Sequence, residues 1–309
     1  MAGGYAHMTA AAEALGRLKK AKILKRDDRR ALKQLRPVVE VGAISPDYPY
    51  MGGQAVWADR MHYQHTGEVI RNGVRIVRTY RMGERRRNYC LAWLFGYAAH
   101  VATDLTIHPV VEGIVGPYAE NKKRHRVCEM HQDAYIWAKR DLGDIGVVNA
   151  LNRCIGDCTN SKGNLRRAIR DLWRDMLRKT YGPDFEAPVP EFDAWNSGFR
   201  RIVEFAAELG TMVAITRHLL EDQGIVYPKP DSVEDEFILD LSTPEGAVHY
   251  DAVFERAVES ILEIWATMGE ALYTNPKKQR EAILAAIPDG NLDTGRDLAK
   301  DRYIYWRQA

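Results

Sequence analysis

Apolar residues recur at intervals of three and four positions along much of this chain, which is the spacing of one face of an α-helix. The pattern is clearest over residues 164–179, 193–222 and 249–273. Proline-containing breaks at residues 182–190 and 227–230 predict loops, and neither is long enough to be a clear domain linker. The pattern predicts an all-α fold, a single multi-helix bundle and one domain over residues 1–309.

A mostly apolar segment at residues 96–109 carries polar side chains at regular positions. His100, Asp104 and His108 follow one another at intervals of four residues. Residues four apart share a helix face, so these three would form one polar line on an apolar helix. Pro109 disfavours helical geometry at the residue before it, so we expect the helix to end at or just past His108.

Further metal-ligand residue types lie nearby in the sequence. His125 and Glu129 repeat the four-residue spacing on another expected helix, and Asp47 lies in a loop with glycines and prolines. Six of the nine histidines fall within the first 130 residues, including His7 and His62. A lone buried histidine is usually a satisfied core residue, but this many unsatisfied groups would cost roughly 1–3 kcal/mol each. Imidazole and carboxylate are zinc-type ligands, so the set predicts a multi-metal site.

An arginine-rich stretch follows His62. Residues 71–87 hold seven arginines and one glutamate, and Asn72-Gly73 lies between short apolar runs. The Asn-Gly pair predicts a short β-hairpin near residues 67–79, the only strand pair expected in the chain. This stretch would either lie beside the metal site and attract phosphate, or form a solvated charged face.

The overall composition indicates an intracellular protein without a membrane span. The net charge is +2, so no global field favours a nucleic-acid partner. Residues 91–102, the longest apolar run, are too few to span a bilayer, and the amino terminus lacks the features of a secretory signal. We therefore expect a cytoplasmic location, with export by a route that needs no signal left open. The chain has four cysteines: Cys90, Cys128, Cys154 and Cys158. We expect all four to be buried reduced thiols, rather than a disulfide or a zinc clip at Cys154 and Cys158.

The order of these ligand-type residues over about residues 5–140 resembles the zinc-dependent phospholipase C family. The shared pattern is His, Pro-Asp, His, His-x-x-x-Asp with a His shortly after, and His-x-x-x-Glu. The family's all-helical fold also occurs in fungal single-strand-specific nucleases, and it holds three zinc ions in a cleft. The resemblance implies one ion at His7 and Asp104, a second at Asp47, His62, His100 and the bridging Asp104, and a third at His108, His125 and Glu129.

Two details stay open at this stage. Either His62 or His65 could be the ligand that follows Asp47, and the spacing favours His62. Secreted family members use an amino-terminal Trp as a ligand; here the amine of Ala2, after removal of Met1, could take that place, or the first residues could be frayed.

The resemblance and the metal chemistry together imply a function. We expect a zinc-dependent phosphodiester hydrolase of phospholipase C type that acts on phospholipid with metal-activated water, binds two or three zinc ions, and uses Asp47 as the catalytic carboxylate. A nuclease or nucleotide phosphodiesterase with the same site is the first alternative, and a non-catalytic structural metalloprotein or interaction module is the second. The helices of residues 145–309 would pack on the metal-bearing part, about residues 1–140. Four aromatic residues near the ligands would contact substrate or pack the core: Tyr48, Tyr50, Trp57 and Tyr63.

Overall fold

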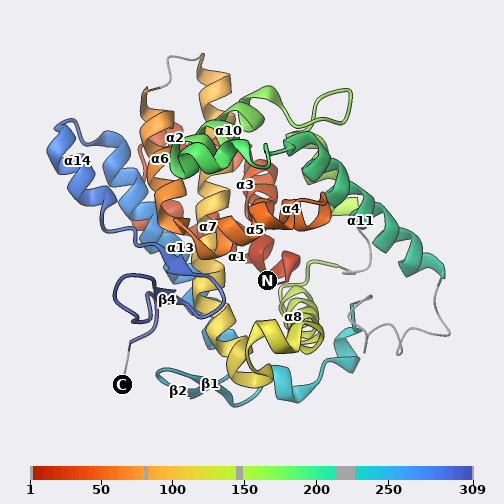
Figure 1. Cartoon of the computed structure of the whole chain (residues 1–309). Helices are drawn as coiled ribbons and strands as arrows, with labels where there is room; N and C mark the ends of the chain where they lie inside the picture. The colour runs from red at the N-terminus through yellow and green to blue at the C-terminus, as the bar shows by residue number, and fades with distance from the viewer. Residues whose placement is uncertain (1–2, 80–82, 144–148, 213–226, 308–309) are drawn as a thin grey trace.

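The fold is mostly α-helical, as the apolar pattern predicts (Figure 1). The computed structural model describes residues 3–79, 83–143, 149–212 and 227–307. The amino-terminal elements are α1 (Gly4–Ala21), α2 (Arg26–Gln34), α3 (Arg36–Gly42), the 3-10 turn η1 (Ser45–Asp47), α4 (Tyr48–Met51), α5 (Ala55–Tyr63), α6 (Thr66–Thr79), α7 (Glu84–Val115) and α8 (Tyr118–Lys139).

The carboxyl-terminal half adds more helices and two small sheets. The elements are α9 (Asn149–Cys158), α10 (Arg167–Tyr181), η2 (Gly182–Glu186), α11 (Phe192–Met212), η3 (Pro230–Ser232), η4 (Asp235–Phe237), β1 (Leu241–Thr243), β2 (Gly246–Val248), α13 (Tyr250–Tyr273), α14 (Lys277–Leu284), β3 (Gly290–Asn291) and β4 (Arg296–Asp297). Strands β1 and β2 pair antiparallel with Leu241 opposite Val248, and β3 and β4 pair with Gly290 opposite Asp297. The helices expected at 164–179 and 249–273 correspond to α10 and α13, and the end of the one expected at 193–222 lies outside the described residues.

Helix α7 is the centre of the packing. It contacts α13 and α3 most extensively, and also α6, α8, α10 and α1 (Figure 1). Every residue from 90 to 108 is buried. Among the described residues, α7 is the one helix long and apolar enough to cross a membrane, but its apolar window is wholly buried inside the protein. Its apolar sequence is accounted for by the helices that surround it, and one hydrophobic core joins residues of both halves of the chain.

The β-hairpin predicted near residues 67–79 is wrong, because this segment is α6. Helical spacing is present among the buried residues of this segment: Val69, Ile70, Val74 and Val77. The prediction gave more weight to the Asn-Gly pair than to this spacing. Gly73 is explained by packing rather than by a turn: a Cβ there would meet the side chain of Leu94 of α7, which would have to move, and would lie 3.2 Å from Met176 of α10. The strand pairs of the described chain lie elsewhere, at β1–β2 and β3–β4.

The arginines of α6 hold this helix to the carboxyl-terminal region. Arg71 donates to Asp289 at 3.0 Å, Arg75 to Glu281 at 2.7 Å, and Arg78 to the carbonyl oxygen of Leu272 at 2.6 Å. Farther along, at the start of α7, Arg86 pairs with Asp171 and Arg87 with Asp28. These five arginines are therefore engaged in structural contacts, and they do not form a free phosphate-attracting face.

Helix α7 does not end at His108, so the predicted helix end is also wrong. The helix continues through Pro109 to Val115. Proline lacks an N–H group, so the carbonyl oxygen of Leu105, four residues earlier, loses its helical hydrogen bond, which normally breaks or kinks a helix. Here the indole Nε1 of Trp306, near the carboxyl terminus, donates to the carbonyl oxygen of Thr106 at 2.8 Å. This contact ties the turn before Pro109 to a distant part of the chain, and His108 lies within the continuous helix rather than at its end.

Candidate metal centre

His62 and His100 point their Nε2 atoms at each other across 3.3 Å. His62 lies in the last turn of α5, and His100 lies in the buried middle of α7. The Nδ1 atom of each ring is held by a backbone carbonyl, Ala58 O at 2.7 Å for His62 and Ala43 O at 3.0 Å for His100. Because a carbonyl only accepts, each Nδ1 carries a proton, and Nε2 is the nitrogen of each ring that faces the cluster. In the neutral form of both rings, two Nε2 lone pairs would face each other.

Two carboxylates approach the same pair of nitrogens. Asp47 Oδ1 lies 3.1 Å from Nε2 of His62 and 3.8 Å from Nε2 of His100. Asp104 Oδ2 lies 3.0 Å from Nε2 of His100 and 3.7 Å from Nε2 of His62. Four electron-pair donors thus converge in a buried space, an arrangement that is favourable around a cation.

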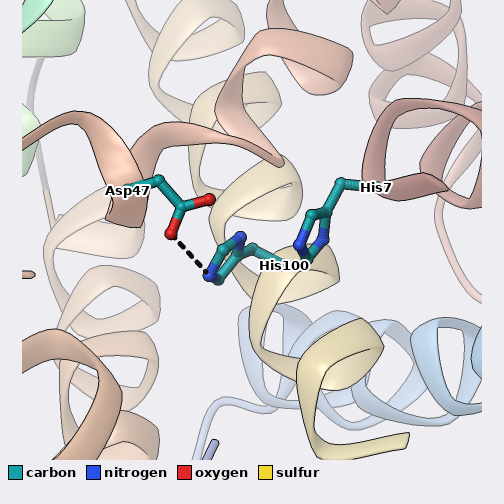
Figure 2. A group of neighbouring side chains, drawn as sticks. All are labelled: His7, Asp47 and His100. Atoms are coloured by element: carbon teal, nitrogen blue, oxygen red, sulfur yellow. Dashed lines mark ion pairs between the residues drawn. The ribbon is translucent and has the colours of Figure 1, made fainter. Parts of the chain in front are cut away.

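The other oxygen of Asp104 faces a different pair of histidines. Its Oδ1 lies 3.2 Å from Nε2 of His7 and 3.1 Å from Nε2 of His108. The ring of His7 stacks on that of His100, with centroids 4.3 Å apart. Figure 2 shows His7, Asp47 and His100 reaching one region from three separate elements. Ligand atoms of these three also lie within 4.8 Å of one another, but the closer contact of His7 is to Asp104, so we place it there. Asp104 has the geometry of a bridging carboxylate.

A further group of possible ligands combines His108 of α7 with two residues of α8. Ligand atoms of His108, His125 and Glu129 all lie within 4.8 Å of one another. Glu129 Oε1 is 3.0 Å from Nε2 of His125 and 3.4 Å from Nε2 of His108. His125 and Glu129 are one turn apart on α8, as their spacing predicts.

The position of α1, which carries His7, is fixed by a buried carboxylate of α8. Asp133 accepts from the backbone N–H groups of Tyr5 at 3.1 Å and Ala6 at 2.6 Å, and from the hydroxyl of Tyr227 at 3.0 Å. The first N–H groups of a helix have no partner within it, so Asp133 caps α1 from a neighbouring helix. Burial raises the pKa of Asp133 to about 7, although these three donors oppose the shift.

Charge in the cluster is strongly coupled. Burial disfavours the ionised carboxylate of Asp104, but His108, His100 and His7 hold its pKa well below the usual range. Burial would lower the pKa of His108, but Asp104 raises it to about 9. The pKa of Glu129 falls to about 2, against the effect of burial, because positive groups surround it. The proton on His108 helps to balance these carboxylates, and a metal ion can replace such a proton.

The donor set fits zinc. Both ring nitrogens of His7 and of His108, and Oδ1 of Asp47, are buried without a hydrogen bond. Such atoms are costly to bury unless a cation satisfies them. Two ligands of a tetrahedral zinc with bonds of about 2.0–2.1 Å lie roughly 3.3–3.4 Å apart. Most separations between the ligand atoms here are close to that value. Imidazole and carboxylate oxygen are both zinc ligands.

All eight residues of the predicted ligand set come together, and their role as ligands stays a prediction. Each of them is buried, with Glu129 the most exposed at 6%. His65 is exposed and lies outside the cluster, so the geometry favours His62. The remaining described histidines have other roles: His131 accepts from the backbone N–H of Glu234, and His249 caps α13 by accepting from that of Asp251. His218 and the amino-terminal residues Met1 and Ala2 lie outside the described residues.

The four nearby aromatic residues divide into two pairs. Tyr48 and Trp57 are completely buried and belong to the hydrophobic core. Tyr50 and Tyr63 are partly exposed, and their ring centroids lie 5.8 Å and 6.1 Å from that of His62. Of these four residues, only Tyr50 and Tyr63 are therefore placed to contact a substrate bound at the cluster.

Two acidic residues near the cluster were not found by sequence reasoning. Asp133 caps α1, and Asp293, in the turn between β3 and β4, lies 3.5 Å from His108. Asp133 lies four residues after Glu129, which is a weak signal that the two share a face of α8. Nothing in the local sequence of Asp293 points to α7.

The sequence matches the family described as zinc-dependent phospholipase C over residues 6–182. Because the match covers more than half of the 309 residues, the chain belongs to the zinc-dependent phospholipase C family. No curated protein and no solved structure matches it. The matched region includes every residue of the predicted ligand set and ends where α10 ends.

Proposed function

We propose that this protein is a zinc-dependent phosphodiester hydrolase of phospholipase C type that binds two or three zinc ions. The observation that carries the proposal is the contact between His62 and His100, whose Nε2 atoms lie 3.3 Å apart while both Nδ1 protons are committed to carbonyl oxygens. Neutral rings repel in that arrangement unless a cation lies between them. Membership of the zinc-dependent phospholipase C family supports zinc as the metal and phospholipid as the class of substrate.

The ligands would divide among the ions according to their contacts. His62, His100 and Asp47 surround one position with Oδ2 of Asp104, and His7 meets Oδ1 of the same carboxylate. His108, His125 and Glu129 would hold a further ion. Bound zinc would lower the pKa of a coordinated water to near 7 and would polarise the phosphoryl oxygens of the substrate.

Asp47 would orient the attacking water. Its side chain is 5% exposed, whereas those of His100 and Asp104 are fully buried, so Asp47 lies nearer the solvent side of the cluster. A carboxylate there can accept a hydrogen bond from the water and hold its lone pair toward phosphorus. The hydroxyls of Tyr50 and Tyr63 donate to Asp59 and Asp293, and burial raises the pKa of both tyrosines, so they stay protonated beside the site.

The two alternative functions have less support. A nuclease would need cationic side chains for a polyanionic substrate, but the described arginines of α6 and two at the start of α7 are engaged in structural contacts. A purely structural zinc site is usually single and closed. Here at least two groups of three potential ligands are distinct, and Asp104 joins neighbouring groups.

The test combines metal analysis with a substrate panel. The purified protein should contain two or three zinc ions per chain and should release phosphorylated headgroup from phosphatidylcholine vesicles faster than nucleotides from single-stranded DNA. Asp47→Asn should lower turnover by roughly two orders of magnitude with a smaller change in KM, because the carboxylate acts mainly in the transition state. Asp27→Asn is the control, since it removes the same charge from an exposed position on α2, a helix that carries no predicted ligand. Zinc-loaded protein that cleaves no phosphodiester in the panel would leave the structural alternative.

A further inference from the structure

Asp293 lies in a carboxyl-terminal turn that is fastened to the ligand-bearing helices. The turn joins β3 to β4, and Asn291 Oδ1 closes it by accepting from the backbone N–H groups of Asp293 at 3.0 Å and Thr294 at 3.2 Å. The backbone N–H of Leu292 donates to the carbonyl oxygen of His62 at 3.0 Å. The backbone beside Asp293 is thus hydrogen-bonded to that of a proposed zinc ligand.

The carboxylate of Asp293 reaches between two side chains of the site. Its Oδ2 accepts from the hydroxyl of Tyr63 at 2.8 Å, and its Oδ1 lies 3.5 Å from Nδ1 of His108. The other nitrogen of that ring, Nε2, faces Asp104 at 3.1 Å and Glu129 at 3.4 Å. One edge of the His108 ring therefore faces the proposed ligands, and the other faces Asp293.

His108 differs from the other ligands of α5 and α7 in how its second nitrogen is held. Nδ1 of His62 and Nδ1 of His100 each donate to a backbone carbonyl, which fixes the ring and its tautomer. Nδ1 of His108 is fully buried, and within the described part of the chain no backbone carbonyl holds it. A metal-binding histidine requires a partner for its other N–H group, and carboxylates often supply it. Asp293 is the carboxylate within ion-pairing distance of this nitrogen.

We propose that Asp293 is a positioning residue of the zinc site: it accepts the Nδ1 proton of His108 and holds Nε2 of that ring toward Asp104 and Glu129. The inference rests on the proposed role of His108 as a zinc ligand. Asp293 lies outside residues 6–182, the region that matches the family. The carboxyl-terminal turn thereby becomes part of this chain's metal centre, with Tyr63 holding the second oxygen of the carboxylate in place.

The first measurement is zinc affinity by competition with a chelator, on the full-length protein. Asp293→Ala should weaken the binding of one ion by about 10- to 100-fold and leave the others unchanged, since loss of a hydrogen-bond partner of a ligand has effects of this size. Asp293→Asn should recover most of the affinity, because its amide oxygen can still accept the proton. Asp301→Ala is the control, because that side chain lies in the same segment and is 89% exposed. Wild-type affinity in Asp293→Ala would overturn the proposal.

The second measurement is independent of whether the alanine variant folds. In zinc-loaded wild-type protein, the Nδ1 proton of His108 should give a strongly deshielded NMR signal that exchanges slowly with water. Asp293→Asn should shift that signal upfield, because a neutral amide is a weaker acceptor than a carboxylate. A signal that exchanges freely, or that is unchanged in the variant, would contradict the proposal. Wild-type protein that binds no zinc would remove the proposed function itself, whereas zinc-loaded protein without this signal would remove only the role of Asp293.

Discussion

Gly42 of α3 and Gly96 of α7 meet backbone to backbone where the two helices cross. A Cβ on Gly96 would lie 2.8 Å from the Cα of Gly42 and would collide with the carbonyl oxygen of Val39. This close approach brings Ala43, the residue after Gly42, near enough for its carbonyl oxygen to hold Nδ1 of His100. Helix packing at one glycine pair therefore sets the orientation of a proposed ligand one turn away.

Gly96→Ala should accordingly affect both stability and metal binding. Forcing the helices apart should lower the free energy of unfolding by about 1–3 kcal/mol, as overpacking commonly does, and should weaken zinc binding. Chemical denaturation and chelator competition measure the two effects. Gly16→Ala is the matched control, because that helical glycine has no heavy atom near its missing Cβ and the change should be neutral or slightly stabilising. Equal behaviour of the two variants would contradict the crossing as a determinant of the site.

Asp104→Asn should remove more than one zinc ion per chain. Its two carboxylate oxygens face different histidines, so loss of the charge should weaken two neighbouring ions at once. Metal content by mass spectrometry on purified protein is the measurement. Asp171→Asn changes another buried carboxylate, which pairs with Arg86 of α7 and Arg174 of α10, and this variant should retain full zinc content. Loss of a single ion would argue that Asp104 is a ligand but not a bridge.

His62→Ala and His65→Ala should differ sharply although the residues are three apart. His62 has its Nε2 atom 3.1 Å from Asp47 and 3.3 Å from the Nε2 atom of His100, whereas His65 is exposed. The first substitution should release zinc and abolish hydrolysis, and the second should leave both near wild type. Zinc titration and headgroup release distinguish them. Zinc loss in His65→Ala alone would reassign the ligand.

Asp133 should make folding stability depend on pH. Its pKa is about 7 in the folded protein against an ordinary value of 3.8, because burial favours the protonated form. Between these values the native state binds a proton that the unfolded state has lost, so the contribution of Asp133 to stability is present below about pH 4 and is lost as the pH rises to about 7. The slope should reach at most about 1.4 kcal/mol per pH unit.

The measurement is the difference in unfolding free energy between wild type and Asp133→Asn, at equal zinc loading, across this pH window. The asparagine variant does not titrate there, so the difference should fall with rising pH. A difference that stays flat across this window would show that the three donors from Tyr5, Ala6 and Tyr227 keep the native carboxylate ionised.

Local spacing was enough to predict the helical fold and the grouping of the eight ligand-type residues. Residues four apart lie on one face of a helix. His100, Asp104 and His108 therefore share a face of α7, and His125 and Glu129 share a face of α8. Local signals failed where distant contacts outweigh them. Asn72-Gly73 lies in a helix because Gly73 permits close packing on α7 and α10. Pro109 lies within a helix whose neighbouring turn is packed against a distant part of the chain, where Trp306, about 200 residues later, donates to the carbonyl oxygen of Thr106.

The contributions of Asp133 and Asp293 could not be predicted for a related reason. Each acts on a residue more than a hundred positions away, Asp133 on the start of α1 and Asp293 on His108. Neither has a spacing that marks it as a ligand, and only the packing of α8 and of the β3–β4 turn brings them to the site. Residues that orient ligands have no fixed sequence spacing, because any element that reaches the site can supply them.

The turn between β3 and β4 also affects when, during synthesis of the chain, the proposed ligand His62 can reach its final hydrogen bonding. All eight proposed ligands lie within the first 129 residues, but the backbone that hydrogen-bonds to His62 belongs to Leu292. The histidines are synthesised long before the turn that hydrogen-bonds to His62, and a contact of such long range carries a large entropic cost of loop closure. Zinc captured early would meet flexible ligands without their final orientation. The support that this turn gives to the proposed metal centre can therefore be completed only after the last part of the chain has been made.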